Sequence, residues 1–210
     1  MGKALCSLAV FLALLSACLA DDTNTLRKSA EKGDATAQLA LGLAYYTGDG
    51  VTKDRAEAVK WYRKSAEQGN AVAQVKLGSA YGSGNGITKN PVMAVTWYRK
   101  ADEQDNPIGQ ANLGLAYYKG IGATKDFVEA VKWFRKSAEQ GNAKGQFNLG
   151  VAYADGNGVP KNLIEAHAWL DLANDEVAQK HLDAVEKQMT KGQIADAAKR
   201  EKVLLATIKK

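Results

Sequence analysis

Residue types on which cross-linked or catalytic proteins depend are scarce in this sequence. Its 210 residues include two cysteines, two histidines and three prolines. Both cysteines, Cys6 and Cys18, fall within the first twenty residues. The rest of the sequence therefore has no thiol for a disulfide, a zinc site or nucleophilic catalysis. The stability of that part must come from packing.

Neither sign of charge dominates. The sequence has 28 Lys and Arg residues against 23 Asp and Glu residues, and the two signs are interspersed. No basic stripe is dense enough to hold a phosphate backbone. We therefore expect no nucleic-acid partner.

The first twenty residues differ in kind from the rest. After Lys3, the 14 residues from Ala4 to Ala17 carry no charge. Such a run is too short to span a bilayer comfortably, but it suits the apolar region of a signal peptide. We predict that residues 1–20 are a signal peptide and that the protein is exported.

Two cleavage sites compete at the end of this leader. Cys18-Leu19-Ala20 suits the ordinary signal peptidase, which cuts after small residues. Residues 15–18, Leu-Ser-Ala-Cys, resemble the bacterial lipobox, in which the cysteine is lipidated. We favour lipidation of Cys18, which would place the protein on the periplasmic face of the envelope with membrane contact only through that anchor. A soluble periplasmic or secreted protein is the alternative.

The remaining sequence repeats itself every 36 residues. Trp61, Trp97, Trp133 and Trp169 are the only tryptophans and follow one another at this spacing. The same spacing relates Gln38, Gln74, Gln110 and Gln146; Gly42, Gly78, Gly114 and Gly150; Tyr45, Tyr81, Tyr117 and Tyr153; and Ala58, Ala94, Ala130 and Ala166. A fixed period without insertion or deletion indicates a repeat architecture.

Each copy is predicted to form two helices. The first helices open at good N-cap residues and end at a Gly-x-Gly, where glycine adopts positive φ easily. Their N-caps are Asp34, Asn70, Asn106 and Asn142. The second helices open at Asp54, Asn90, Asp126 and Asn162, and Glu57, Glu129 and Glu165 complete predicted capping boxes. They end at Gly33, Gly69 and Gly141, with Asp105 in place of a glycine.

These patterns predict an all-α fold, an α/α solenoid of helix–turn–helix repeats. One copy cannot bury enough apolar surface alone, so the copies must stack. After a short N-terminal cap from residue 21, the copies span 28–63, 64–99, 100–135 and 136–171. The template fails after Trp169, and residues 172–210 are predicted to be C-terminal capping helices. Asn174 is expected to cap the first of these, and a Thr190–Gln193 capping box the second.

The repeated string resembles that of a known family. It reads Ala-x-Gln-x-x-Leu-Gly-x-x-Tyr-x-x-Gly-x-Gly-Val and then Ala-x-x-Trp-Tyr-x-Lys-Ser-Ala-Glu-Gln-Gly. This is similar to the Sel1-like repeat, a relative of the tetratricopeptide repeats, over residues 28–171. The resemblance implies a right-handed superhelix that acts as an adaptor for proteins or peptides. Bacterial members are often exported and act in envelope assembly, signalling or host contact.

Catalysis is the weaker interpretation. A cysteine-rich branch of this family is linked to β-lactam hydrolysis, and Ser29-Ala-Glu-Lys32 fits the Ser-x-x-Lys pattern of such enzymes. The next copy has Gln68 in place of the lysine, and no Lys-Thr-Gly or Ser-Asp-Asn partner is present. His167 and His181 have no sequence-local partner for metal or acid–base work. We expect no enzyme, no cofactor and no metal site. A cell-wall enzyme acting on peptidoglycan or β-lactams, or its regulator, is the alternative.

The candidate site is the face that varies between copies. Positions 36, 40, 43 and 47 of the first helix and their equivalents share one helical face and depart from the template. In stacked helical repeats the first helices line the concave side, the usual docking groove. We predict that this face binds a protein or peptide and that the protein is a monomer. Merely tolerant surface positions are the alternative. The residues that carry the prediction are Tyr46, Lys76, Asn112, Tyr118 and Asn148.

Overall fold

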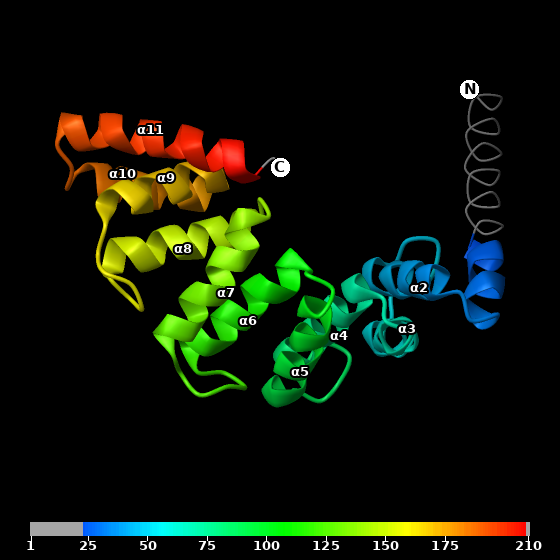
Figure 1. Cartoon of the computed structure of the whole chain (residues 1–210). Helices are drawn as coiled ribbons and strands as arrows, with labels where there is room; N and C mark the ends of the chain where they lie inside the picture. The colour runs from blue at the N-terminus through cyan, green and yellow to red at the C-terminus, as the bar shows by residue number, and fades with distance from the viewer. Residues whose placement is uncertain (1–22, 209–210) are drawn as a thin grey trace, which may run out of the picture. The chain divides into compact units, whose positions relative to one another are not determined.

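The computed structural model describes residues 23–208, and all regular elements among them are α-helices (Figure 1). The predicted signal peptide, residues 1–20, and its Cys18 lie outside the described residues. None of the described helices combines the length and the apolar character that a membrane span needs. The chain divides into two compact units, one ending at Asn90 and the other beginning at Pro91.

The first unit contains a helix over residues 23–31, followed by three longer helices. These are α2 (Ala35–Thr47), α3 (Arg55–Glu67) and α4 (Ala71–Ser83). Helix α3 packs against both α2 and α4. The helix–turn–helix arrangement predicted from the 36-residue period is therefore confirmed in this unit.

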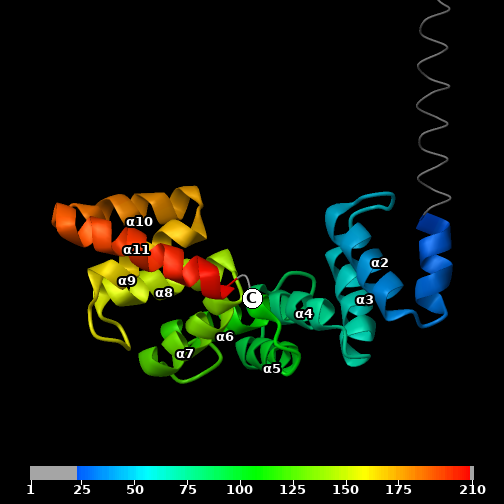
Figure 2. The same ribbon diagram turned by 45° about the horizontal axis from the view of Figure 1, so that its top comes forward.

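The second unit contains seven described helices. They are α5 (Pro91–Asp102), α6 (Pro107–Lys119), α7 (Phe127–Glu139), α8 (Ala143–Asp155), α9 (Leu163–Ala173), α10 (Glu176–Glu186) and α11 (Lys191–Ile208). Each helix from α5 to α9 packs on the next. The last helix, α11, turns back to lie along α9, and it also contacts α7 (Figure 2).

The predicted starts of the first helices are confirmed. Asp34 and Asn70 accept hydrogen bonds from the backbone N–H groups of Ala37 and Ala73 at 2.7 and 3.0 Å. Asn106 and Asn142 cap α6 and α8 in the same way. Each cap satisfies an N–H group that has no partner within its own helix, which fixes where the helix begins.

The capping boxes predicted at Glu57, Glu129 and Glu165 are wrong in their second half. The N–H of the N-cap residue Asp54 donates to the carbonyl of Tyr45 at 2.9 Å, and the other copies repeat this bond. The preceding helix thus already satisfies the N–H group that the glutamate was expected to bind. The three carboxylates instead bind Lys60, Lys132 and Arg200.

The second glycine of each Gly-x-Gly has two reasons to be glycine. Gly86 and Gly158 have φ of 75° and 77°, a region that side chains disfavour. A Cβ at either position would also lie 2.1 Å from a backbone oxygen, that of Arg55 or Phe127. The turn can therefore approach the start of the preceding second helix only without a side chain.

Glycines inside the first helices permit close packing within each helix pair. A Cβ at Gly114 would lie 2.4 Å from Cδ1 of Phe134, a ring that is fully buried. At Gly150 the corresponding contact is Cγ of Leu170 at 2.8 Å. The missing methyl group lets the second helix insert a large side chain against the first, which offsets glycine's low helix propensity.

The recurring glutamines fasten successive helix pairs. Gln38 is 4% exposed, and its amide donates to the carbonyl of Ala30 at 3.0 Å. Gln74 makes the equivalent bond to Ala66 at 3.2 Å. These carbonyls lie in the last turn of a helix, where intrahelical partners run out. In these copies the buried amide thus replaces water at the helix end. In copy three the amide of Gln110 instead donates to Oδ1 of Asp102 at 2.8 Å.

The C-terminal cap differs from the prediction in one detail. Asn174 is not the N-cap of the next helix but the left-handed C-cap of α9, with φ of 45°. Asp175 opens α10 instead and accepts from the N–H of Ala178 at 2.7 Å. The capping box before α11 is confirmed, because Thr190 N–H donates to Gln193 Oε1 at 2.8 Å and Gln193 N–H donates back to Thr190 Oγ1 at 3.3 Å.

Candidate binding surfaces

The predicted variable face has a cavity in the first copy. Ala40, Leu43 and Thr47 of α2 line a space of about 500 Å³, together with Thr23 and Leu26 of the preceding helix. The lining is mainly aliphatic. Close by in sequence, Tyr46 is 41% exposed, and the guanidinium of Arg55 lies 6.0 Å from its ring centroid. An apolar hollow beside a half-exposed aromatic suits a side chain of a protein partner.

The predicted site residues Asn112 and Asn148 already have hydrogen-bond partners within the second unit. The Lys144 ammonium donates to Asn112 Oδ1 at 2.8 Å, and the Asn148 amide donates to the Lys144 carbonyl at 2.6 Å. Partial desolvation lowers the pKa of Lys144, and the nearby charge of Lys119 lowers it further. In copies three and four this face therefore presents a lysine bound to an amide instead of two free amides. Lys76, in the first unit, is exposed on α4.

Tyr118 packs against aromatic rings at the edge of the core and is not free on the surface. Its ring centroid lies 4.9 Å from that of Phe127 and 6.2 Å from that of Phe134. Its hydroxyl accepts a hydrogen bond from the amide of Asn157 at 3.1 Å. Sequence reasoning assigned Tyr46 and Tyr118 the same role, but of the two only Tyr46 is exposed, at 41%.

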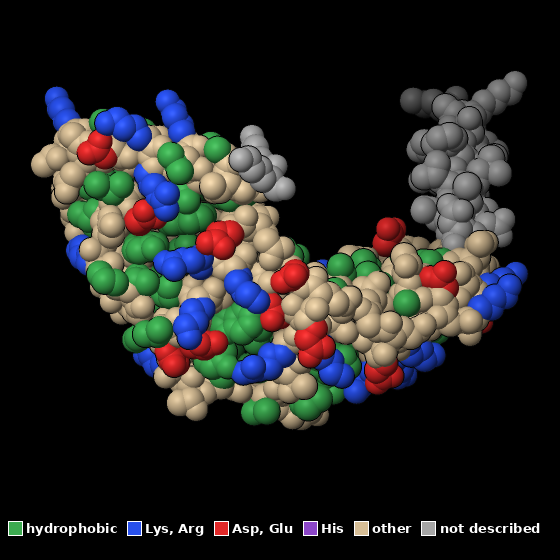
Figure 3. Space-filling view, in the orientation of Figure 1, with side chains coloured by type: hydrophobic (Ala, Val, Ile, Leu, Met, Phe, Trp, Pro, Cys, Tyr) green, Lys and Arg blue, Asp and Glu red, His purple; other side chains and the backbone are tan. Residues whose placement is uncertain are grey.

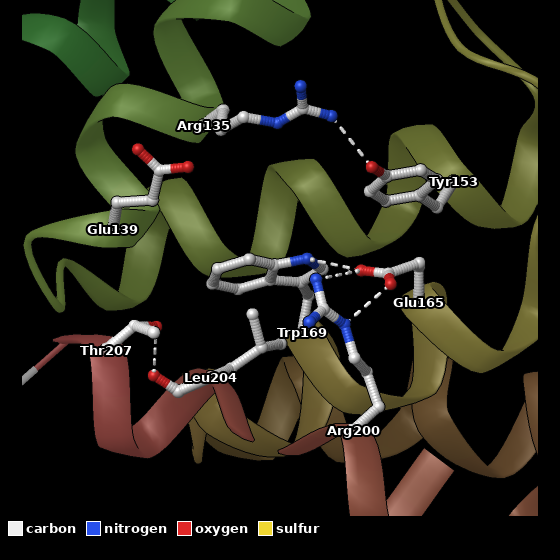
Figure 4. A pocket seen from close by; sticks show the side chains of 8 residues that line it. All are labelled: Arg135, Glu139, Tyr153, Glu165, Trp169, Arg200, Leu204 and Thr207. Atoms are coloured by element: carbon white, nitrogen blue, oxygen red, sulfur yellow. Dashed lines mark hydrogen bonds and ion pairs between the residues drawn. The ribbon is translucent and has the colours of Figure 1, made fainter. Parts of the chain in front are cut away.

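A second hollow, which sequence reasoning missed, lies in the second unit beside α11. It measures about 600 Å³ and is bounded by four helices (Figure 4). Its lining residues are Arg135 and Glu139 of α7, Tyr153 of α8, Glu165 and Trp169 of α9, and Arg200, Leu204 and Thr207 of α11.

One wall of this pocket is a fixed polar cluster. Arg200 Nε donates to Glu165 Oε1 at 2.7 Å, and the indole Nε1 of Trp169 donates to Glu165 Oε2 at 3.2 Å. The side chain of Glu165 is only 18% exposed, so the ion pair is partly shielded from water. The glutamate thus holds both the ring of Trp169 and helix α11 in place.

The opposite wall carries charges without an ionic partner. The Arg135 guanidinium donates to the hydroxyl of Tyr153 at 2.7 Å, a neutral acceptor. Glu139 lies one helical turn further along α7 and forms no ion pair among residues 23–208. In Figure 4 both side chains project from α7 on the side of the pocket opposite α11. The pocket therefore has one open cation and one open anion at its edge.

The Arg–Tyr pair is itself a repeated feature. Arg27 donates to Tyr45 and Arg63 to Tyr81, at 2.7 and 2.8 Å, and each guanidinium also lies over the tyrosine ring at 5.8 and 5.7 Å. The pocket arises only in the last copy, because α11 closes it there. The sequence does contain a sign of this difference. Ala168 and Leu172 stand at positions where copies one and three have lysines.

The serine considered as a nucleophile has a structural role at two of its equivalent positions. Ser65 and Ser137, the equivalents of Ser29, are fully buried and donate to the carbonyls of Ala35 and Pro107. The serine is thus a structural link between helices. No cluster of three or more His, Cys, Asp or Glu side chains with metal-binding geometry occurs within the described part of the chain.

The buried histidine is held by the C-terminal cap. His167 is 6% exposed, and its Nε2 lies 2.9 Å from Glu186 Oε1 on α10. It stands where the other copies have Val59, Val95 and Val131, and it is buried as they are. On the face of the second unit seen in Figure 3, charged side chains of both signs lie among hydrophobic ones.

Comparison with known proteins identifies the family. The Sel1 repeat model matches residues 35–70, 71–106, 107–142 and 143–176. The chain belongs to the Sel1 repeat family. The matched copies start at the first helix of each pair, whereas the copies delimited from the sequence start at residue 28. Sel1 repeat proteins typically mediate protein–protein interactions, and the scaffold is generally non-catalytic.

Solved structures share this fold. A protective antigen of uropathogenic Escherichia coli with an SLR fold is 36% identical, with a TM-score of 0.83 over 89% of this chain and 41% of that one. A Sel1 repeat protein of Oxalobacter formigenes is 34% identical, with a TM-score of 0.67 over 78% of this chain and 48% of that one. This chain thus spans less than half the length of either relative. An immunity protein of Pseudomonas aeruginosa, 21% identical with a TM-score of 0.53 over 90% of this chain and 73% of that one, shares the fold alone. The search of curated proteins found no match.

Proposed function

We propose that this chain is an exported Sel1 repeat adaptor that binds a protein or peptide partner in the bacterial cell envelope. The observation that carries the proposal is the cavity of about 500 Å³ on α2. Its lining includes Ala40, Leu43 and Thr47, which belong to the face that departs from the repeat template. Fully buried positions such as Leu41, Leu77, Leu113 and Leu149 are identical in the four copies, whereas the residues at the positions of this hollow differ from copy to copy, as ligand selection would require.

Cross-linking at defined positions tests the adaptor function. A photo-reactive residue is placed at Tyr46 or Lys76 on the variable face, and a control is placed at Lys60 on α3, whose side chain is 69% exposed. After irradiation of intact cells we expect the same partner to be linked from positions 46 and 76 and absent from position 60. Equal labelling from position 60, or no labelled protein at all, would contradict the proposal.

A substitution in the cavity sharpens this test. Leu43→Glu places a charge in the mainly aliphatic hollow, where a buried partner side chain would leave it poorly solvated. We expect capture to fall about tenfold or more, the equivalent of about 1.4 kcal/mol, with helicity by circular dichroism unchanged. Lys60→Gln is the matched surface control and should capture like the natural chain.

Export and anchoring rest on the leader sequence. The mature protein is proposed to begin at a lipidated Cys18 and to face the periplasm, with the anchor as its membrane contact. Mass spectrometry of the mature amino terminus tests this, and Cys18→Ala should release the protein from the membrane fraction. An unmodified start at Asp21 would contradict the anchor and leave the soluble exported form.

A further inference from the structure

Two lysines meet on the variable face of the second unit. Lys119 is the last residue of α6, and Lys144 lies in the first turn of α8. The Lys144 ammonium reaches across to α6, where it donates to Asn112 Oδ1 at 2.8 Å. Loss of water around this ammonium lowers the pKa of Lys144, and the charge of Lys119 lowers it further. The two cations are therefore near enough to repel each other.

Neither lysine has a carboxylate partner among residues 23–208. The lysines that form ion pairs in this range are Lys60, Lys132, Lys136, Lys180 and Lys199. The acceptor of Lys144 is a neutral amide, which compensates less for lost water than a carboxylate does. A carboxylate between the two ammonium groups would attract both of them and offset their repulsion. This part of the variable face therefore favours an anionic ligand.

The amides beside the lysines favour a peptide over other anions. Asn112 accepts from Lys144 through its oxygen, so its NH2 group can donate to a backbone carbonyl of a ligand. The Asn148 amide donates to the Lys144 carbonyl at 2.6 Å, and its oxygen can accept a backbone N–H group. A peptide supplies both groups next to an acidic side chain, whereas a phosphate has no N–H. Nucleic acid is disfavoured as well, because its binding depends on many phosphate contacts.

The lysine pair distinguishes this place from the corresponding places of the earlier copies. One lysine stands at the end of a first helix and the other near the start of the next first helix. The same two positions hold uncharged residues between copies one and two and between copies two and three, namely Thr47 with Val72 and Ser83 with Ile108. The repeat fold thus does not require a cation at either position, and the pair is available for recognition.

We infer that this cluster binds an acidic segment of the partner protein, with an aspartate or glutamate carboxylate between Lys119 and Lys144. The amides of Asn112 and Asn148 bind the backbone next to that acidic residue. This inference rests on the proposed adaptor function and adds the chemical class of segment that the second unit recognises.

Calorimetric titration of the full chain with short peptides tests the inference. The probes are an acetylated and amidated hexapeptide of alternating alanine and glutamate, and the same peptide with glutamine or lysine in place of glutamate. Alternation places the charges on one side of an extended chain. We expect the glutamate peptide to bind at least fivefold more tightly than the glutamine peptide, and the lysine peptide to bind more weakly still. Equal binding of the glutamate and glutamine peptides overturns the inference.

Single substitutions locate the site. Lys119→Gln and Lys144→Gln should each weaken the glutamate peptide at least threefold, with helicity unchanged. Lys199→Gln is the matched control, because it removes the same charge from an exposed lysine that pairs with Asp196 on α11. It should leave the affinity unchanged, and equal weakening by all three variants would contradict the assignment. Lys119→Gln keeps the test decisive if Lys144→Gln fails to fold, because Lys119 is exposed at a helix end.

Reversal of the charge gives a test that a change in stability cannot imitate. The double variant Lys119→Glu with Lys144→Glu should bind the lysine peptide more tightly than the glutamate peptide. A double variant that still prefers the glutamate peptide overturns the inference. Vesicles of phosphatidylglycerol are the competing anionic surface. Vesicle binding that is tighter than peptide binding in the natural chain and is lost in Lys119→Gln would assign the lysines to a lipid surface and reject a peptide.

Photo-cross-linking from position 46 reports on the adaptor function in the other unit. A partner captured there, with no preference for the glutamate peptide, would leave the adaptor standing and reject this site. No partner at position 46, with a glutamate preference that both lysine variants remove, would support this site and reject the cavity on α2.

Discussion

Two tryptophans at equivalent positions in adjacent copies have different surroundings. Trp133 is half-buried, its indole N–H has no hydrogen-bond partner, and the Lys136 ammonium lies 5.0 Å from its ring centroid. Trp169 is 3% exposed, and its N–H donates to Glu165. The sequence template is the same at both positions. Burial of the ring does not require α11, because Trp61 and Trp97, in the first two copies, are 7% and 5% exposed. In the last copy α11 lies along α9, and its Arg200 pairs with the glutamate that the indole binds.

The cap changes the chemistry of the copy that it covers. At the places of Lys132 and Lys136, copy four has Ala168, which is fully buried, and Leu172, which packs on the same core cluster. Glu129 binds the exposed Lys132, whereas its equivalent Glu165 binds Arg200 of α11. A solenoid end thus requires a changed set of side chains, because an exposed face becomes an interior one.

Removal of each tryptophan should give the largest contrast. Trp169→Ala is expected to cost about 3–5 kcal/mol, as for other buried aromatics cut to alanine. Trp133→Ala should cost less, about 2 kcal/mol, because part of its surface already contacts water. Urea unfolding followed by circular dichroism measures both. Equal losses would show that the difference in exposure between the two rings has no effect on stability.

The aliphatic contact of α11 gives the next largest effect. Leu204 is 5% exposed, and its neighbour Val203 is 53% exposed. Leu204→Ala should cost about 2–3 kcal/mol, while Val203→Ala should stay within about 0.5 kcal/mol of the natural chain. Hydrogen exchange should show that the loss of protection is greatest in α11. Similar effects of the two substitutions would mean that α11 packs less firmly than this burial implies.

Sequence reasoning reached the features that depend on near neighbours. The N-caps of the first helices and the Gly-x-Gly turns follow from local backbone chemistry, and the structure has them at these residues. Asp105, which stands at a glycine position, also has positive φ. The reciprocal half of the capping boxes failed because Asp54 N–H bonds to Tyr45, in the preceding helix. Local reasoning could not rank that competing acceptor above Glu57.

The candidate site was less predictable than the fold. The stripe on α2 could be derived from variation among copies, and three of its residues line a cavity. The engagement of Asn112 by Lys144 depends on how α6 and α8 face each other, which no spacing within one helix reveals. The α11 pocket needs Arg200 beside Glu165, 35 residues apart and outside the template. Such a contact follows from the path of the cap and not from the repeat.

The two equivalent glutamates allow a smaller test of the same comparison. Arg200→Gln leaves the poorly exposed Glu165 carboxylate with the indole N–H of Trp169 as its remaining hydrogen-bond donor among the described residues, and should cost about 1–3 kcal/mol. Lys132→Gln breaks the exposed pair with Glu129 and should cost about 0.5 kcal/mol or less. Thermal unfolding of both variants measures the difference. Adding Glu165→Gln to Arg200→Gln should restore part of the lost stability, because it removes the unpaired carboxylate. If the double variant is no more stable than Arg200→Gln alone, an unpaired, partly buried charge is not the cause of the loss.

The smallest predicted effect concerns a carboxylate of the last copy, the one that α11 packs against. Asp171 stands where the earlier copies have Arg63, Arg99 and Arg135. Burial raises the pKa of Glu201 on α11, and the Asp171 carboxylate raises it further, while His167 on α9 and Lys202 on α11 act in the opposite direction. A carboxyl whose pKa is higher in the folded state than in the unfolded state binds more protons when folded. Its stabilising contribution is therefore complete below the unfolded pKa and is lost as the pH rises through the folded value.

Glu201→Gln should accordingly make the protein more stable at pH 7 than the natural chain, by less than about 1 kcal/mol because the carboxyl keeps much of its water. Near pH 4 the two proteins should unfold at the same denaturant concentration, since the natural carboxyl is then protonated and equally uncharged. Urea titrations at a series of pH values between 4 and 8 give the comparison, and Glu176→Gln, at a side chain that is 86% exposed, is the control with a flat difference. A Glu201→Gln variant that is less stable than the natural chain at pH 7 would contradict this prediction. It would show that the contact between α9 and α11 stabilises the ionised form of Glu201, in spite of the nearby Asp171 carboxylate.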